Sequence, residues 1–153
     1  MALLFAFLIG FFAGLRSLTA PATIAWAVHL GLLKLDRPLS LIGTLPSVVF
    51  FTVLAIGELV LDKFPKAPNR TQPLGLVARL LTGGLTGACV LAGLGHGAII
   101  GALLGAAGGL VGCFLGFFLR TQLSKAVGEQ AFYVALMEDL VAIGGCFWIV
   151  SHF

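Results

Sequence analysis

The stretch MALLFAFLIGFFAGLRSLTAPATIAWAVHL, residues 1–30, decides the fold. It begins apolar, and apolar sequence resumes directly after the polar segment GLRSLTAP. A straight helix over residues 2–33 would be roughly 48 Å long, which exceeds a hydrocarbon core of about 30 Å. Because Pro21 removes a donor and disfavours helical backbone before it, we expect two helical pieces, residues 2–15 and 21–34. They form either one broken, tilted span or a re-entrant hairpin.

The composition identifies lipid as the solvent of this chain. Hydrophobic residues make up 59% of the sequence, charged residues only 10%, and the mean hydropathy is +1.12. A water-soluble domain carries about 25% charged residues. At 153 residues the chain is expected to form a single integral membrane domain, residues 1–153. Its few basic residues form no stripe, so a nucleic acid is not expected as a partner.

Four further apolar segments have the length of a spanning helix, which needs about 20 residues. They cover residues 40–61, 74–94, 97–119 and 131–150. Polar segments separate most of them, and only Gly95, His96 and Gly97 stand between the third and fourth spans. The sequence therefore predicts an all-α, polytopic transmembrane helical bundle. It has about five spans, a broken or re-entrant first segment and a tight antiparallel hairpin at Gly95.

The basic residues predict the orientation, because cytoplasmic loops are enriched in lysine and arginine. If the first segment crosses once, one side holds Lys63, Lys66, Arg70, Arg120 and Lys125. The other side then holds Lys34 and Arg37. This places the N-terminus and the two larger loops in the cytoplasm. A re-entrant first segment would bring Lys34 to the side of the N-terminus and change the later assignment.

Glycines recur at the spacing of a helix face. One row consists of Gly97, Gly101, Gly105 and Gly109, and a second of Gly108, Gly112 and Gly116. Gly83 and Gly87 form a pair on the third span. Since helices in lipid gain little from hydrophobic association, such rows let backbones approach closely. We expect the third and fourth spans to pack together and a homo-oligomer to form through Gly101, Gly105, Gly108, Gly112 and Gly116. A glycine-lined conduit is the alternative.

Six ionisable residues fall within or beside the predicted spans: Arg16, Glu58, Arg79, Arg120, Glu138 and Asp139. The antiparallel order of the spans places the last five at similar depth, and Arg16 can join them from the broken first segment. We expect Arg16 to meet Glu58, Glu138 or Asp139. Charges within spans face protein or water and are normally paired. The cluster is either an ion-pair lattice that fixes helix register or a site for an ion, a proton or an anionic solute.

Further polar residues extend this candidate binding site: Ser17, Thr19, Asp62, Lys63, Thr82 and Thr86. Arg79, Thr82 and Thr86 share one helix face, which could continue a polar path from the cluster. Alternatively the threonine hydroxyls bond their own helix. The cysteines and histidines show no metal-ligand spacing, so no metal and no cofactor are expected.

Four segments carry a resemblance to a known family: GLRSLTAPA, ELVLDKFPKAPNRTQPLGLVARLLTGGLTGA, GALLGAAGGLVGCFLGFFLR and ALMEDLVAIGG. Together they resemble small bacterial integral membrane proteins grouped as a domain of unknown function. The resemblance implies a protein of the bacterial inner membrane and implies no activity. The residues that stand in these segments are Arg16, Glu58, Asp62, Lys63, Pro65, Arg79, Arg120, Glu138 and Asp139.

The expected function is that of a small transporter or channel-like protein whose site is the Arg/Glu/Asp cluster beside the broken helix. The alternative is a non-catalytic protein that interacts with membrane lipid or acts as a scaffold, in which the charge cluster is structural. A membrane-embedded enzyme is a third possibility, but the sequence shows no catalytic constellation.

Overall fold

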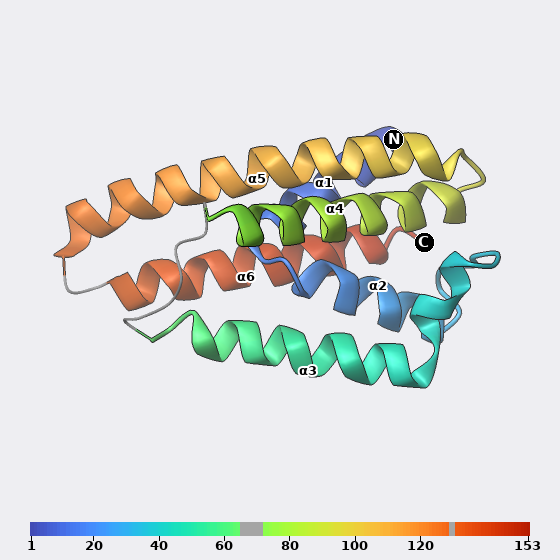
Figure 1. The fold of residues 1–153 in the computed structure, drawn as a ribbon, viewed down its shortest axis with the longest axis horizontal. Helices are drawn as coiled ribbons and strands as arrows, with labels where there is room; N and C mark the ends of the chain where they lie inside the picture. The colour runs from blue at the N-terminus through green and yellow to red at the C-terminus, as the bar shows by residue number, and fades with distance from the viewer. Residues whose placement is uncertain (65–71, 129–130) are drawn as a thin grey trace.

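The computed structural model describes residues 1–64, 72–128 and 131–153. Over these residues the chain is all-helical, as predicted, and its helices run roughly parallel or antiparallel to one another in a bundle (Figure 1). The elements are α1 (Ala2–Leu15), α2 (Thr19–His29), the short 3-10 helix η1 (Leu39–Gly43), α3 (Leu45–Leu61), α4 (Pro73–Gly93), α5 (Ala98–Val127) and α6 (Ala131–Val150).

The helices and their outer surfaces suit a bilayer. Within the described residues, α4, α5 and α6 are long and apolar enough to cross a membrane, while α1 and α3 are shorter apolar helices. Large apolar side chains point outward along α3, among them Val49, Val53 and Ile56, each more than half exposed. Because exposing so large an apolar surface to water is unfavourable, lipid must cover it. The chain is an integral membrane protein.

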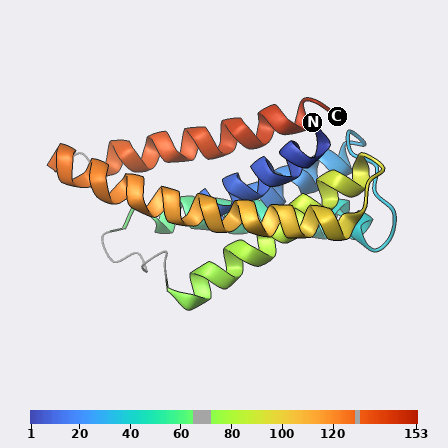
Figure 2. The same cartoon turned by 90° about the horizontal axis from the view of Figure 1, so that it is seen from above.

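The first two helices form a re-entrant hairpin, which was one of the two predicted alternatives. α1 enters the bundle from one end, the chain turns at residues 16–18, and α2 returns to the same end (Figures 1 and 2). At that end Phe5 of α1 lies against Trp148 near the end of α6, with ring centroids 5.9 Å apart. Just beyond α2, Leu33 packs against Gly93, the last residue of α4.

The helix break lies within the predicted segment GLRSLTAP, and the first piece ends at Leu15 as predicted, but the second piece begins earlier than expected. We expected the second piece to begin at Pro21, whereas α2 begins at Thr19 and contains Pro21 in its first turn. A proline is tolerated there because the N–H groups of the first turn have no partner within the helix. The break is instead made by Arg16, whose extended backbone (φ −137°, ψ 108°) ends α1.

The hairpin also overturns the predicted side of the N-terminus. Since α1 and α2 do not cross, the N-terminus lies at the opposite end of the bundle from the end of α3 and from Lys125 (Figure 1). The C-terminus lies at the same end as the N-terminus. Placing the N-terminus together with the basic loops was therefore wrong. Of the residues in that argument, Lys66 and Arg70 lie outside the described residues.

The predicted contact between the third and fourth spans is confirmed, and it is made by glycines. Gly83 and Gly87 of α4 lie directly against Gly105 and Gly101 of α5, so closely that a Cβ on any of the four would collide with the opposite backbone. Gly95, with φ +76°, makes the tight turn between the two helices. Close backbone contact increases the dispersion attraction between the two helices. This matters in a membrane, where helices gain little from hydrophobic association.

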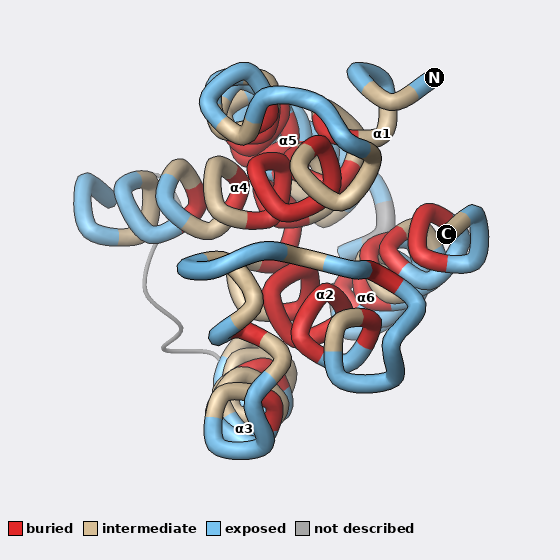
Figure 3. Tube along the Cα trace, turned by 90° about the vertical axis from the view of Figure 1, so that its right-hand side faces the viewer, coloured by how far each residue is buried: buried red, intermediate tan, exposed pale blue. Residues whose placement is uncertain are grey.

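A third helix joins the same contact, which the sequence did not indicate. Gly10 and Gly14 of α1 lie against Gly105 and Gly109 of α5, again with backbone touching backbone. The buried parts of α1, α4 and α5 accordingly face one another (Figure 3). We call this region the glycine contact. It fixes α1 in the bundle along most of its length.

The glycines predicted for a homo-oligomer are used within one chain. Gly101 and Gly105 face α4, Gly108 and Gly112 face α1, and Gly116 faces the side chain of Leu15. A homo-oligomer would need another surface, and its existence stays a prediction. Helix α5 is also longer than predicted: it continues past residue 119 to Val127, because no glycine or proline interrupts it before Gly128.

Candidate functional site

The turn of the re-entrant hairpin is held by a carboxylate from another helix. Glu58 of α3 accepts hydrogen bonds from the backbone N–H of Ser17 (3.0 Å), from the Ser17 hydroxyl (2.8 Å) and from the backbone N–H of Leu18 (2.9 Å). These donors precede α2, whose N-terminus favours a negative charge. Glu58 was one of three expected partners of Arg16. It instead binds the backbone N–H groups of the turn between Arg16 and α2.

Arg16 itself is buried and paired with two other carboxylates. Its side chain is only 1% exposed, its Nη1 lies 2.8 Å from Oδ2 of Asp62 on the C-terminal cap of α3, and its Nη2 bonds Oδ1 of Asp139 on α6. Of the three predicted partners of Arg16, namely Glu58, Glu138 and Asp139, the structure pairs it with Asp139. Asp62, which the sequence placed only in the second rank of candidates, is the other partner. Because a buried guanidinium without counter-ions would be strongly destabilising, these pairs tie the hairpin to α3 and α6.

The pairs continue into α5. Nη1 of Arg120 lies 2.8 Å from the same Oδ2 of Asp62, and 3.8 Å from Oε2 of Glu138. Five side chains thus alternate in charge along one connected series, the ion-pair chain: Asp139, Arg16, Asp62, Arg120 and Glu138. Exposure rises along it from 1% at Arg16 to 28% at Arg120. The antiparallel order of the spans predicted that Arg120, Glu138 and Asp139 lie at similar depth, and all three belong to this series.

Two buried polar atoms at the turn are left without a hydrogen bond. Within the part of the chain that the structure describes, Nε of Arg16 and Oγ1 of Thr19 have no partner, although both residues are almost fully buried. Leaving such a group unsatisfied costs about 1–3 kcal/mol.

The structure also describes the contacts of Arg79, Thr82, Thr86 and Lys63. Arg79 is buried in α4, where its Nη1 donates to the carbonyl of Gly75 (3.3 Å). The hydroxyls of Thr82 and Thr86 donate to carbonyls of their own helix. Of the two predicted arrangements, a polar path or bonds within the helix, the structure shows the second. The ammonium of Lys63 lies 5.7 Å from the centre of the Phe132 ring. Pro65 lies outside the described residues.

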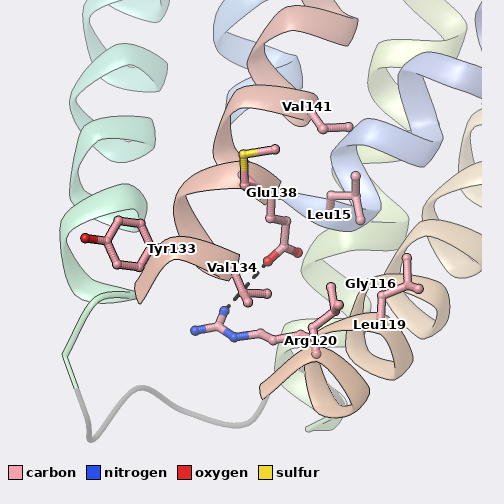
Figure 4. Close-up of a pocket in the computed structure, with 10 residues that line it drawn as sticks. Leu15, Gly116, Leu119, Arg120, Tyr133, Val134, Glu138 and Val141 are labelled. Atoms are coloured by element: carbon pink, nitrogen blue, oxygen red, sulfur yellow. Dashed lines mark ion pairs between the residues drawn. The ribbon is translucent and has the colours of Figure 1, made fainter. Parts of the chain in front are cut away.

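A cavity of about 430 Å³ opens beside the ion-pair chain, between α5 and α6 (Figure 4). Its walls are apolar except for Arg120 and Glu138, whose side chains point toward each other in the close-up. The lining residues are Leu15, Gly116, Leu119, Arg120, Leu123, Tyr133, Val134, Met137, Glu138 and Val141. A volume of this size is typical of a ligand site.

Comparison with protein families identifies one match. A family model described as a domain of unknown function (DUF4126) matches residues 3–152, nearly the whole chain. The chain belongs to this family. Comparisons with curated proteins and with solved structures gave no match. Membership of DUF4126 confirms the resemblance, and the description of the family names no activity.

In this DUF4126 protein the sequence did not anticipate the bridging role of Asp62 or the cavity. Asp62 bridges Arg16 and Arg120, and its distance of four residues from Glu58, about one helical turn, was the available signal that both carboxylates reach the same place. The cavity between α5 and α6 had no sequence signal.

Proposed function

We propose that this protein is a small transporter or channel-like protein whose ion-pair chain binds an ion, a proton or an anionic solute. One observation carries the proposal: a series of alternating charges runs from the buried turn of a re-entrant hairpin to the rim of an open cavity. Ionisable residues and irregular backbone at membrane depth usually line ion or substrate pathways.

The geometry supports exchange of partners within the ion-pair chain. A single oxygen of Asp62 lies 2.8 Å from both Arg16 and Arg120, so a proton or cation arriving at Asp62 would weaken two ion pairs at once. An anion arriving at Arg120 would compete with Asp62 and Glu138. Meanwhile Glu58 holds the backbone of the turn through separate hydrogen bonds, so the turn keeps its place while side chains change partners.

Flux through reconstituted vesicles tests this function. We expect the parent protein to carry protons or small anions down an imposed gradient, and Asp62→Asn to lower that flux by about tenfold or more. Asp36→Asn is the matched control, because Asp36 is an exposed acid outside the ion-pair chain, and we expect it to retain parental flux. A parent protein that is folded but passes no ion under any gradient would refute the proposal.

Two further variants separate transport from folding. Arg16→Ala removes the most buried cation of the ion-pair chain, and Asp139→Asn neutralises the carboxylate at its buried end. We expect Asp139→Asn to stay folded, judged by thermal unfolding in detergent, and to lose flux. If both variants lose flux only in proportion to lost folded protein, the ion-pair chain is structural and the transport proposal fails.

The proposed location is the bacterial inner membrane. Lys63, Arg120 and Lys125 lie toward one end of the bundle, while Lys34 and Arg37 follow α2 at the other. The enrichment of basic residues in cytoplasmic loops supports the first end as the cytoplasmic one. Both termini then face the opposite side, which cysteine labelling of either terminus in intact cells would test.

A further inference from the structure

The cavity between α5 and α6 lies at the level where hydrocarbon meets headgroups. The part of α5 from residue 98 to residue 119 is roughly 33 Å long at 1.5 Å per residue, close to a hydrocarbon core of about 30 Å. Arg120 therefore stands at the boundary, and the polar last turns of α5 project beyond it. Gly116 and Val141 line the cavity on the hydrocarbon side, and Tyr133 lines it on the headgroup side. Tyrosine is enriched at this level of a membrane.

The walls of the cavity fit an alkyl chain rather than a polar solute. Leu15 closes its inner side, and Leu119, Met137 and Val141 form much of the remaining lining (Figure 4). Met137 and Val141 are more than half exposed, so the cavity communicates with the surrounding lipid. A membrane places acyl chains at this surface at high local concentration. One of them is the natural occupant.

The two charged side chains in the lining restrict the headgroup. Arg120 is 28% exposed and Glu138 is 11% exposed, and their closest charged atoms are 3.8 Å apart. A headgroup with only negative charge would meet Glu138 as well as Arg120 and would be repelled by it. A headgroup that carries a phosphate and a primary ammonium offers one charge to each side chain, with hydrogen bonds to both.

We propose that this cavity is a binding site for an aminophospholipid of the phosphatidylethanolamine type. One acyl chain lies along Leu119 and Val141, the phosphate binds Arg120, and the ammonium binds Glu138. The site goes beyond the proposed transport function and does not rest on it, because lipid occupancy is measured without any flux. Either proposal can therefore fail while the other stands.

Native mass spectrometry of the full chain tests the headgroup. The protein is released from mixed micelles that contain equal amounts of dioleoyl phosphatidylethanolamine, phosphatidylglycerol and phosphatidylcholine. We expect one retained phosphatidylethanolamine per chain, favoured about fivefold or more over each competitor. Equal retention of the three lipids, retention of phosphatidylglycerol instead, or release of the protein only as a lipid-free oligomer would overturn the proposal.

Two pairs of variants test the site itself. Val141→Trp fills the cavity, and Leu140→Trp is its control, because Leu140 lies on the same helix, is similarly exposed and is not part of the lining. We expect Val141→Trp to lower retention about tenfold and Leu140→Trp to leave it unchanged. Equal retention by the two variants would place the lipid elsewhere and overturn the proposal.

The second pair tests the charges. Glu138→Gln should abolish the preference for phosphatidylethanolamine over phosphatidylglycerol while retaining lipid. Lys125→Gln, which removes an exposed cation at the same end of α5 but outside the lining, should preserve the preference. If Glu138→Gln keeps the preference, or Lys125→Gln removes it, the headgroup does not lie between Arg120 and Glu138.

Discussion

Helix α5 is held in two different ways on its two sides. Toward α4 and α1 it makes the glycine contact, in which backbones touch and a single methyl group would not fit. Toward α6 it makes an ion pair between Arg120 and Glu138 and leaves a cavity of about 430 Å³. The first side depends on shape. The second depends on charge and borders an open cavity.

The difference shows what can join helices when water does not drive them together. Without a hydrophobic gain, contact must come from dispersion between close backbones or from polar groups that have no better partner in lipid. The glycine contact uses the first source and tolerates little change. The ion-pair chain uses the second, and its link between Arg120 and Glu138 joins α5 and α6 beside a cavity that has room for another molecule.

The charged side is expected to give the largest effect on stability. Arg16→Met leaves Asp139 buried without its counter-ion and should lower the free energy of unfolding by about 3–5 kcal/mol. Chemical unfolding in detergent measures the loss. In the double variant Arg16→Met with Asp139→Leu the uncompensated charge is gone, so much of the stability should return. A double variant that is less stable than Arg16→Met would show that Asp139 does not act through this pair.

The glycine contact comes next. Gly105→Ala places a Cβ against the backbone of Gly83 and should cost about 1–3 kcal/mol, because neither helix can move without losing its other contacts. Gly57→Ala in α3 is the matched control, since nothing lies within 4 Å of a Cβ at that position. There we expect no loss, or a gain of up to about 1 kcal/mol from helix propensity. Equal losses in the two variants would contradict tight packing at Gly105.

A smaller effect is expected at the turn before α2. Glu58→Ala removes the acceptor of the Ser17 and Leu18 N–H groups and should cost about 0.5–2 kcal/mol, in the range of a lost helix-capping hydrogen bond. Hydrogen exchange at these two amides measures the effect locally. Exchange that is unchanged in the variant would mean that the carboxylate does not hold the turn.

The smallest effect is expected at Thr86. Its hydroxyl bonds carbonyls of its own helix, which keep their backbone partners when it is lost, so Thr86→Val should change stability by less than about 1 kcal/mol. Flux should also stay at the parental level. A loss of flux without a loss of stability would revive the polar path along α4.

The sequence predicted those features of the site that follow from spacing and depth. Glycines four residues apart indicated the contact of α4 with α5, and the antiparallel order of the helices brought Arg120, Glu138 and Asp139 to one level. Spacing alone could not choose the partner of the second glycine row. It faces α1, because the re-entrant hairpin lays Gly10 and Gly14 along α5.

The direction of the first two helices was beyond sequence reasoning for a physical reason. Pro21 permits a break before it but does not set the angle of the chain at the break. That angle is set by groups distant in sequence, namely Glu58 on the backbone of the turn and Asp62 and Asp139 on Arg16. The N-terminal side was predicted wrongly because it depends on this angle.

The partners of Arg16 also set an order in time. Arg16 leaves the ribosome 123 residues before Asp139, which at about 5–20 residues per second is a delay of roughly 6–25 s. During synthesis the hairpin must therefore wait, first for α3 and then for α6, before its guanidinium is neutralised on both sides. The element that begins the chain is completed last, so a nascent chain stopped before residue 139 should leave its first two helices accessible to membrane chaperones.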